Sequence, residues 1–375
     1  MQIRIAQPED SKALVNFYKE FPLQGQVEIK VDRFNDYFAP YQVQSDRYLS
    51  YLMEDDVKTI HGTASFVIQN LHHQGQLQTV AWGRDLRIAN NRQAVLNWSQ
   101  HFLPVLNEVA QTFQTQFTLS VINLADTQAL NAFVRLKPSK RPLPRYYLFR
   151  RLNLISVHGQ LPWANNPLPH LRIKHAQPHH ADALAHYVVK KSLERDLASV
   201  WNADSFFDKI HRYKNLRLED FLIAVDHQDN IVGCCAPWSS ANIQEQIPLH
   251  YSTRGHNFRQ FLKFGEQFGW TRSLTKPIHR LQTEASFNFR YLNFLFANNA
   301  DIFESLLWSA YDNVNENEFL VYSQMRSEPL YRRPFTWITA KRQYGVYLIA
   351  PPDTAPPDFL HPRNERSIEI EPFFI

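Results

Sequence analysis

Two stretches of the chain share one pattern of apolar and polar residues. Residues 77–95 and residues 287–302 each contain an apolar run that ends in Ala-Asn-Asn, and each then takes up the spacing of an amphipathic helix. This pattern predicts a strand that turns directly into a helix at residues 89–91 and again at residues 297–299. Because the free N–H groups of a first helical turn attract anions, we expect two copies of one phosphate-facing unit.

A second repeated pattern supports a duplication of the chain. A short alternating segment at residues 3–5 is followed by Gln-Pro and a helical pattern, and the same text returns at residues 171–178. At an offset of 170 residues, Gln7, Pro8, Ala13 and Leu14 match Gln177, Pro178, Ala183 and Leu184. An ordered series of matches indicates an internal repeat, and hence two domains of one topology.

The periodicity also predicts the elements between these landmarks. In the first half we expect a helix with loops over residues 27–46, strands over 48–53, 58–69, 117–122 and 145–152, and helices over about 93–112 and 126–136. In the second half we expect a helix over residues 204–216 and strands over 221–225, 231–236, 319–324 and 343–350. The predicted fold class is therefore α/β (α+β), with two tandem domains that each have a mixed, mostly antiparallel sheet flanked by helices.

A proline-containing segment and an insertion define the expected domain bounds. Residues 156–170 contain three prolines, so we expect them to link domains at residues 1–155 and 171–375. The second domain has an insertion at about residues 242–286 that is rich in aromatic and basic residues. It either lines a groove for an acceptor or partner, or forms an extra helix that packs its Phe side chains on the core.

Length, charge and cysteine usage narrow the class of function. The 375 residues exceed one ordinary core, and the net charge of +4 is spread along the chain, so we expect no nucleic-acid partner. The start of the chain is charged and no apolar run reaches about 18 residues, so we expect no membrane partner and a cytoplasmic location. Cys234 and Cys235 are adjacent and the histidines lack further spaced ligands, so we expect neither a disulfide nor a metal site.

The order of these elements resembles the GNAT acyltransferase superfamily, as a tandem-domain member. The opening IRIAQPEDSKAL of residues 3–14 is similar to the usual start of such domains, and the likeness covers most of the chain twice. The resemblance implies acetyl-CoA, or another acyl-CoA, as cofactor and a small-molecule or protein amine as acceptor. It also implies that the cofactor's pyrophosphate binds at the turn before the long helix.

The resemblance implies a phosphate loop whose pattern falls on residues 93–98. Gln93 matches the pattern, but Leu96 and Trp98 stand where the family has small residues. In the second copy Asp301 would repel an anion, so the first copy is the expected cofactor site. The alternative is that the Asn-Asn turns only cap helices. The candidate cofactor-binding residues are Ile88, Asn90, Asn91, Arg92, Gln93, Ala94 and Val95.

The resemblance further implies a base for the amine and an acid for the departing thiolate. Asp85 lies on the strand before the first turn and is the candidate base, and its expected counterpart in the second copy is Asn293. In the first copy Phe133 stands where the family has an acidic tyrosine, so Tyr331 of the second copy is the candidate acid. Asp85 could instead be a solvated carboxylate paired with a neighbouring arginine, and water could serve either role.

Two functions of different classes remain open from the sequence. The first is an N-acetyltransferase that transfers an acetyl group from acetyl-CoA to an amine. The second is a catalytically degenerate tandem module that binds a CoA-like ligand or a protein partner. Gln93, Arg92 and Asp85 favour the enzyme, whereas the missing glycines and Phe133 favour the binding module.

Overall fold

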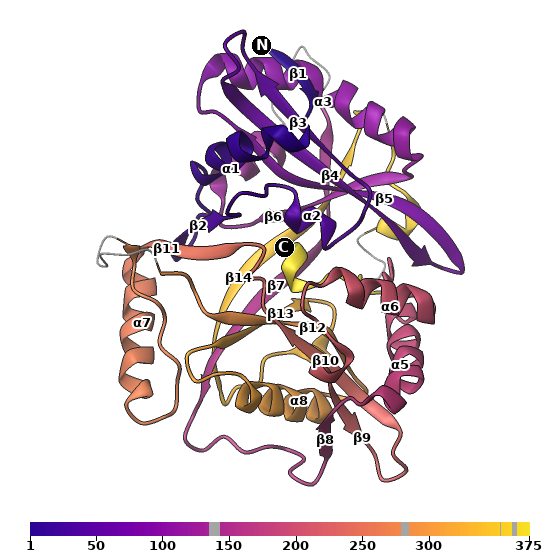
Figure 1. The fold of residues 1–375 in the computed structure, drawn as a ribbon, viewed down its shortest axis with the longest axis vertical. Helices are drawn as coiled ribbons and strands as arrows, with labels where there is room; N and C mark the ends of the chain where they lie inside the picture. The colour runs from indigo at the N-terminus through magenta and orange to yellow at the C-terminus, as the bar shows by residue number, and fades with distance from the viewer. Residues whose placement is uncertain (135–142, 279–284, 353, 362–365) are drawn as a thin grey trace. The chain divides into compact units, whose positions relative to one another are not determined.

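The chain consists of two compact units, each assembled from separate segments (Figure 1). The computed structural model describes residues 1–134, 143–278, 285–352, 354–361 and 366–375. Unit 1 contains Met1–Leu23, Lys30–Arg151 and Tyr344–Glu365, and unit 2 contains Gln24–Ile29, Leu152–Gln343 and Arg366–Ile375. Among the helices of these described ranges, none is long and apolar enough to span a membrane.

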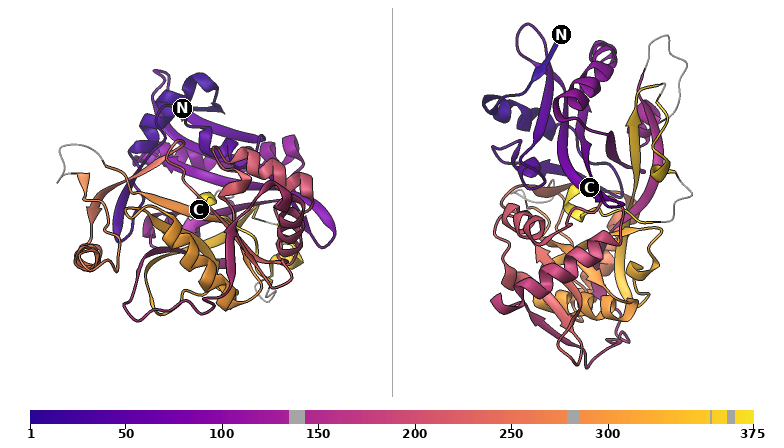
Figure 2. Two further views of the ribbon diagram at one scale, coloured as in Figure 1. Left: turned by 60° about the horizontal axis from the view of Figure 1, so that its bottom comes forward. Right: turned by 90° about the vertical axis from the view of Figure 1, so that its right-hand side faces the viewer.

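Unit 1 is built on an antiparallel sheet with one parallel pair, β5 with β6. In sheet order its strands are β1 (Gln2–Ile5), β3 (Tyr48–Glu54), β4 (Ile60–His73), β5 (Gln76–Ile88), β6 (Phe117–Asn123) and part of β14 (Trp337–Ala350). The helices α1 (Ser11–Lys19) and α3 (Arg92–Phe113) cover opposite faces of the sheet (Figure 2). Trp98 and Phe102 of α3 pack with Phe66 of β4 in one apolar core, which fixes the start of α3 next to the end of β5.

Unit 2 repeats this arrangement, again with one parallel pair, β12 with β13. In sheet order its strands are β8 (Arg172–His175), β9 (Leu222–Val225), β10 (Ile231–Trp238), β12 (Phe289–Ala297), β13 (Phe319–Met325) and part of β7 (Arg145–Gln160). Its helices are α5 (Ala181–Leu193), α6 (Ala203–Arg212), α7 (Thr253–Glu266) and α8 (Ala300–Asn313). The six strands of unit 2 follow the same order as the six strands of unit 1, so the prediction of two repeated, mostly antiparallel domains is confirmed.

Shorter elements complete the two units. These are α2 (Ala39–Gln42), α4 (Thr127–Ala129), the π-helical turn η2 (Leu130–Val134) and the 3₁₀ helices η1 (Pro8–Asp10), η3 (Pro178–His180), η4 (Leu218–Asp220), η6 (Pro329–Tyr331), η7 (Asp358–Leu360) and η8 (Pro372–Phe374). The strand β2 (Val27–Asp32) pairs with β11 (Glu245–Tyr251) in a separate two-stranded sheet. Leu136, where the sequence places the end of a helix, lies outside the described residues.

Each half of the chain ends in a long strand, and part of that strand pairs with strands of the other half. Residues 152–157 of β7 pair antiparallel with β13 in unit 2, and residues 344–349 of β14 pair antiparallel with β6 in unit 1. Residues 156–160, which the sequence assigns to the linker, therefore continue β7. The predicted domain bounds at residues 1–155 and 171–375 are continuous ranges and do not include this exchange of strands. They stay a prediction.

One expectation about local structure is wrong, and a second is correct only in part. The region 27–46 begins with the strand β2 and contains only the four-residue helix α2, because the alternation in VEIKVD is that of a strand. The insertion does form an extra helix, α7, but Phe261 and Phe264 are exposed and Leu262 is buried instead. Phe258 of the same helix is half-buried, with its ring 5.5 Å from that of the buried His158, so only part of the predicted Phe face packs inward.

Candidate functional site

Each unit contains one pair of parallel strands that pair over only part of their length. In unit 1, residues 80–83 of β5 pair with residues 117–120 of β6, and neither strand pairs with the other beyond them. In the neighbouring ladder Ser65 lies opposite Arg84 and Thr63 lies opposite Arg87, so β5 carries one extra residue. This bulge turns the backbone of Asp85 to a φ of 49°. The split and the bulge together separate the end of β5 from β6.

The turn of residues 89–91 connects the split strand β5 to α3. Asn91 is the N-cap of α3, and its Oδ1 accepts a hydrogen bond of 2.7 Å from the N–H of Ala94. Among the described residues, the N–H groups of Arg92 and Gln93 have no acceptor. Asn90, Asn91, Arg92 and Gln93 are exposed. The predicted strand, turn and helix are confirmed, and this helix start offers N–H groups and a cation to an anion.

The residues aligned with the family's glycine pattern, 93–98, do not form the turn before α3. Residues 93–98 lie within the first two turns of α3, not in the loop before it. The side chain of Leu96 is exposed, and Trp98 is buried in the core beneath the sheet. Neither side chain therefore occupies the turn itself, and the expected obstruction of a phosphate by Leu96 and Trp98 has no structural basis.

The strand ends at the split are more open in unit 1 than in unit 2. Leu86 and Ile88 of β5 are half-buried, whereas their counterparts Leu295 and Ala297 of β12 are buried. Val95 on the first turn of α3 is also exposed, while Ala94 is buried. The strand end is therefore more accessible in unit 1 than in unit 2. The assignment of Ile88 and residues 90–95 as cofactor contacts stays a prediction.

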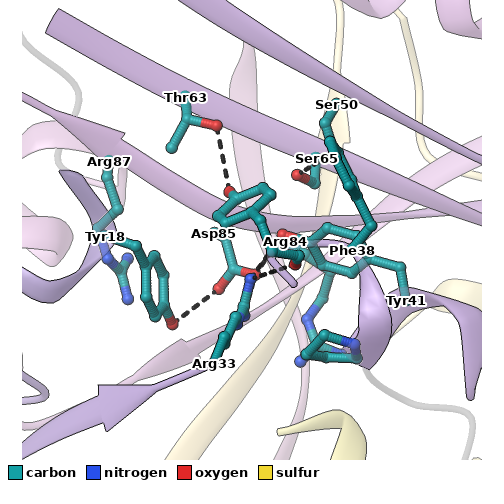
Figure 3. A network of polar contacts seen from close by, with 12 residues as sticks. Tyr18, Arg33, Phe38, Tyr41, Ser50, Thr63, Ser65, Arg84, Asp85 and Arg87 are labelled. Carbon is teal, nitrogen blue, oxygen red and sulfur yellow. Dashed lines mark hydrogen bonds and ion pairs between the residues drawn. The ribbon is translucent and has the colours of Figure 1, made fainter. Parts of the chain in front are cut away.

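Asp85 forms the centre of a buried polar network in unit 1 (Figure 3). Its Oδ1 accepts a hydrogen bond of 3.1 Å from the hydroxyl of Tyr18, and its Oδ2 accepts bonds of 2.6 Å from both Arg33 and Tyr41. The side chains of Asp85 and Arg33 are 8% and 2% exposed. The interpretation of Asp85 as a solvated carboxylate paired with a neighbouring arginine is therefore wrong, because its partner Arg33 lies 52 residues away.

The protonation of Asp85 follows from these contacts. Burial alone would raise the pKa of Asp85, but Arg33, assisted by Arg84 and Arg87, outweighs it and holds that pKa well below its usual range. Burial and the adjacent Asp85 carboxylate raise the pKa of Tyr41, which therefore keeps its proton. A carboxylate whose two oxygens already accept hydrogen bonds is a weak proton acceptor. The role of Asp85 as a general base stays a prediction.

Sequence reasoning missed three members of the network, Arg33, Tyr18 and Tyr41. Arg33 follows β2 directly, and the guanidinium lies 4.3 Å from the ring centre of Tyr18 and 5.2 Å from that of Tyr41. The signal available in the sequence was a single arginine within an aromatic-rich segment, and the assignment of that segment to a helix concealed it. Aromatic faces around a buried guanidinium contribute cation–π stabilisation.

The counterpart of Asp85 in unit 2 is Phe294 and not Asn293. Ala236 lies opposite Asn293 and Cys234 lies opposite Phe296, so β12 has a bulge like that of β5. Phe294 has a φ of 49°, the same as Asp85. The expected match was wrong by one residue because the bulge position depends on strand pairing, which the sequence does not display.

The other candidate catalytic residue, Tyr331, lies in unit 2. It is buried in η6, and its hydroxyl accepts a hydrogen bond of 3.2 Å from the N–H of Ala297 at the end of β12. Burial raises the pKa of Tyr331 to about 12, so the hydroxyl keeps a proton that it could donate. Tyr331 lines a small pocket together with Arg195 and Glu328, which form an ion pair of 2.9 Å. Its role as the acid stays a prediction.

Residues 366–375 lie against the split between β12 and β13. The Oγ of Ser323 on β13 donates a hydrogen bond of 2.6 Å to the carbonyl of Ile370. The ring of Phe373 lies 5.0 Å from that of Trp238 and 5.7 Å from that of Tyr291. Lys209 anchors the same segment through an ion pair of 2.7 Å with Glu371. Residues 368–372 of this segment line the same pocket as Tyr331, whereas Leu295 and Ala297 are buried in a core with Ile302 and Phe303 of α8.

No family model matches the chain, and no curated protein matches its sequence. Among solved structures, the chain is similar to N-myristoyltransferase of Saccharomyces cerevisiae with bound myristoyl-CoA, at 8% identity and a TM-score of 0.55, over 98% of this chain and 85% of that chain. It is also similar to a GCN5-related N-acetyltransferase of Sphaerobacter thermophilus, at 12% identity and a TM-score of 0.50, over 95% and 97% of the two chains. At these identities the similarity concerns the fold. The chain therefore has the GNAT acyltransferase fold, in two repeated domains.

Proposed function

We propose that the chain is an acyl-CoA-dependent N-acyltransferase that binds acyl-CoA in unit 1. The observation that carries the proposal is the difference between the two split strand pairs. Leu86 and Ile88 are half-buried at the end of β5, whereas Leu295 and Ala297, their counterparts in unit 2, are buried. The two similar structures bear the names of acyl transferases, and one of them contains myristoyl-CoA. Fold likeness supports the class of reaction only as an analogy.

The residues around the split suit the parts of an acyl-CoA. The N–H groups of Arg92 and Gln93 and the side chain of Arg92 would hold the diphosphate, because they present hydrogen-bond donors and positive charge. Leu86, Ile88 and Val95 would line the path of the apolar part. Acyl-CoA supplies the acyl group as a thioester. We expect acetyl-CoA to be the donor and a small-molecule or protein amine to be the acceptor.

Asp85 at the bulge fixes the positions of the side chains around it. Asp85 holds Tyr18, Arg33 and Tyr41 in fixed positions through its two oxygens. We propose that Asp85 is a positioning residue that acts through these partners, because its low pKa and its filled hydrogen-bond sites suit an anchor better than a base. Tyr331 remains the proposed acid only for acyl-CoA bound in unit 2.

The test is a measurement of acyl transfer by the full chain. Acetyl-CoA and a longer acyl-CoA are each incubated with a panel of amines, and the release of CoA thiol is followed while mass spectrometry identifies the acylated amine. We expect release that depends on both the amine and the enzyme. Failure of both acyl-CoAs to bind, measured by calorimetry, would contradict the proposal.

A second candidate function is a module that binds acyl-CoA without transferring the acyl group. Two observations favour it: Phe133 cannot donate a proton to a thiolate, and both oxygens of Asp85 are occupied. Tight binding of acetyl-CoA with no thiol release above background, across the amine panel, would select this function over the enzyme.

A further inference from the structure

The polar network of unit 1 contains more positive than negative charge. Three guanidinium groups, those of Arg33, Arg84 and Arg87, act on one carboxylate, that of Asp85. Only Arg33 forms an ion pair with it among the described residues, at 2.6 Å. Within the described residues, Arg84 and Arg87 form no ion pair, so their two positive charges have no counter-charge there. Because charges removed from water are normally paired, this excess is a sign of a missing anion.

The hydrogen-bond partners of the two other arginines are neutral. The Nη1 of Arg84 donates to the side-chain oxygen of Gln44 at 3.0 Å, and the Nη1 of Arg87 donates to the carbonyl of Leu86 at 3.1 Å. Each guanidinium has five N–H donors, so most donors of Arg84 and Arg87 remain available. Both side chains are half-buried, and a ligand can therefore reach them.

Buried donors without partners point to the same place. The Nε groups of Arg33 and Arg87 are buried and have no hydrogen-bond partner within the described part of the chain. The ring of Tyr18 contacts both guanidinium groups, at 4.3 Å for Arg33 and 5.5 Å for Arg87. Tyr18 itself is fixed by its hydrogen bond to Asp85. Arg87 is thus held in position beside the bulge before any ligand binds.

We infer that unit 1 takes an amine acceptor that carries a carboxylate, and that Arg84 and Arg87 hold this carboxylate. The inference rests on the proposed function, because it places the anion beside the strand end where the acyl group would lie. A planar carboxylate matches the fork of a guanidinium in a bidentate contact. The phosphates of acyl-CoA have their own donors at Arg92 and the start of α3, so the anion at the bulge belongs to the acceptor.

The test compares two ligands that differ only in the carboxylate. N-acetylglycine resembles an acylated amino acid, and N-methylacetamide has the same amide without the carboxylate. Their binding to the full chain is measured by calorimetry or ligand-observed NMR, with and without CoA. We expect N-acetylglycine to bind at least about tenfold more tightly, because a charge-assisted bidentate contact contributes at least this factor.

Matched variants assign the effect to the two arginines. Arg84→Met and Arg87→Met should each remove most of the preference for the carboxylate. Arg47→Met is the control, since Arg47 is exposed in the same unit and binds Asn70 rather than Asp85. If Arg87→Met does not fold, Arg87→Lys keeps the charge without the bidentate fork and should lose part of the preference.

Three outcomes would overturn the inference. These are equal binding of the two ligands, a preference that survives in both Met variants, and a preference that disappears once CoA is bound, which would assign the anion site to a phosphate of CoA. The proposed function fails separately. If no amine is acylated but the preference for N-acetylglycine persists and depends on Arg87, the carboxylate site is supported and the proposed transferase activity is contradicted.

Discussion

Asp85 of β5 and Phe294 of β12 occupy the same position in the two repeated domains, and each has a φ of 49° at a bulge. One side chain is a carboxylate bound to Arg33, and the other packs its ring 5.7 Å from that of Phe206. A non-glycine residue at positive φ is strained, yet both domains keep it. The bulge is therefore the shared feature, and the side chain on it differs between the two units.

Replacing Asp85 tests the stability of the buried network. Asp85→Asn removes the charge that pairs with Arg33, and asparagine tolerates the positive φ. We expect the free energy of unfolding to fall by about 3–5 kcal/mol, because Arg33 is left buried without a counter-charge. Adding Arg33→Met should restore most of the loss. Urea unfolding of both variants checks this, and equal stability of the single and double variants would contradict it.

The same double variant tests whether Asp85 is a base. A positioning residue takes no proton during the reaction. We therefore expect the rate of acyl transfer by the folded double variant to stay within about tenfold of wild type. A base would cost roughly 10² to 10⁴ in rate. Rates are measured as a function of pH at saturating acyl-CoA. A loss in the larger range, with normal folding, would restore Asp85 as the base.

A charge reversal at the start of α3 tests the cofactor site. Arg92→Glu places a negative charge beside the proposed diphosphate, and we expect the affinity for acetyl-CoA to fall at least about tenfold at low salt. Asp301→Arg is the matched control, because Asp301 lies in the first turn of α8 in unit 2. Calorimetry that shows a change with Asp301→Arg alone would move the cofactor to unit 2.

The pH dependence of stability should depend on His158. Burial lowers the pKa of His158 to about 3, whereas an unfolded histidine titrates near 6.5. The unfolded chain thus binds this proton first, and the free energy of unfolding falls by up to a few kcal/mol as the pH falls from 6.5 towards 3.

His158→Phe removes this proton site and should flatten the fall in stability between pH 7 and pH 5. The ring suits the position, since His158 lies 4.6 Å from the ring of Phe319 and 5.5 Å from that of Phe258. The exposed His211, changed to Phe, is the control. Urea unfolding curves at several pH values that are parallel for wild type and His158→Phe would exclude this origin of acid sensitivity.

The anchor of residues 366–375 can be tested at Lys209. Its ammonium pairs with Glu371 at 2.7 Å and with Glu369 at 3.4 Å, and all three side chains are buried. Lys209→Met leaves two buried carboxylates without their lysine partner, so we expect a loss of about 3–5 kcal/mol and faster proteolysis of this segment. Glu371→Gln in addition should recover part of the loss. Unchanged proteolysis of Lys209→Met would show that the aromatic contacts of Phe373 suffice.

The features that sequence predicts well in this chain are local. The turn at residues 89–91 joins a strand to a helix, and the side chain of Asn91 caps the helix that follows it. The pairing of Asp85 with Arg33 joins residues 52 positions apart, and the register that sets Phe294 against Asp85 arises from two bulges. Periodicity carries no information on either, which is why the fold class was predictable and the surroundings of Asp85 were not.

The exchange of last strands also affects how the chain is made. β6 receives its partner, residues 344–349, about 220 residues after β6 itself leaves the ribosome. At about 5–20 residues per second, the open edge of β6 waits roughly 10–45 s for completion. During translation this edge can pair with strands of other nascent chains, so the yield of folded protein should depend on chaperones that shield β6 until β14 emerges.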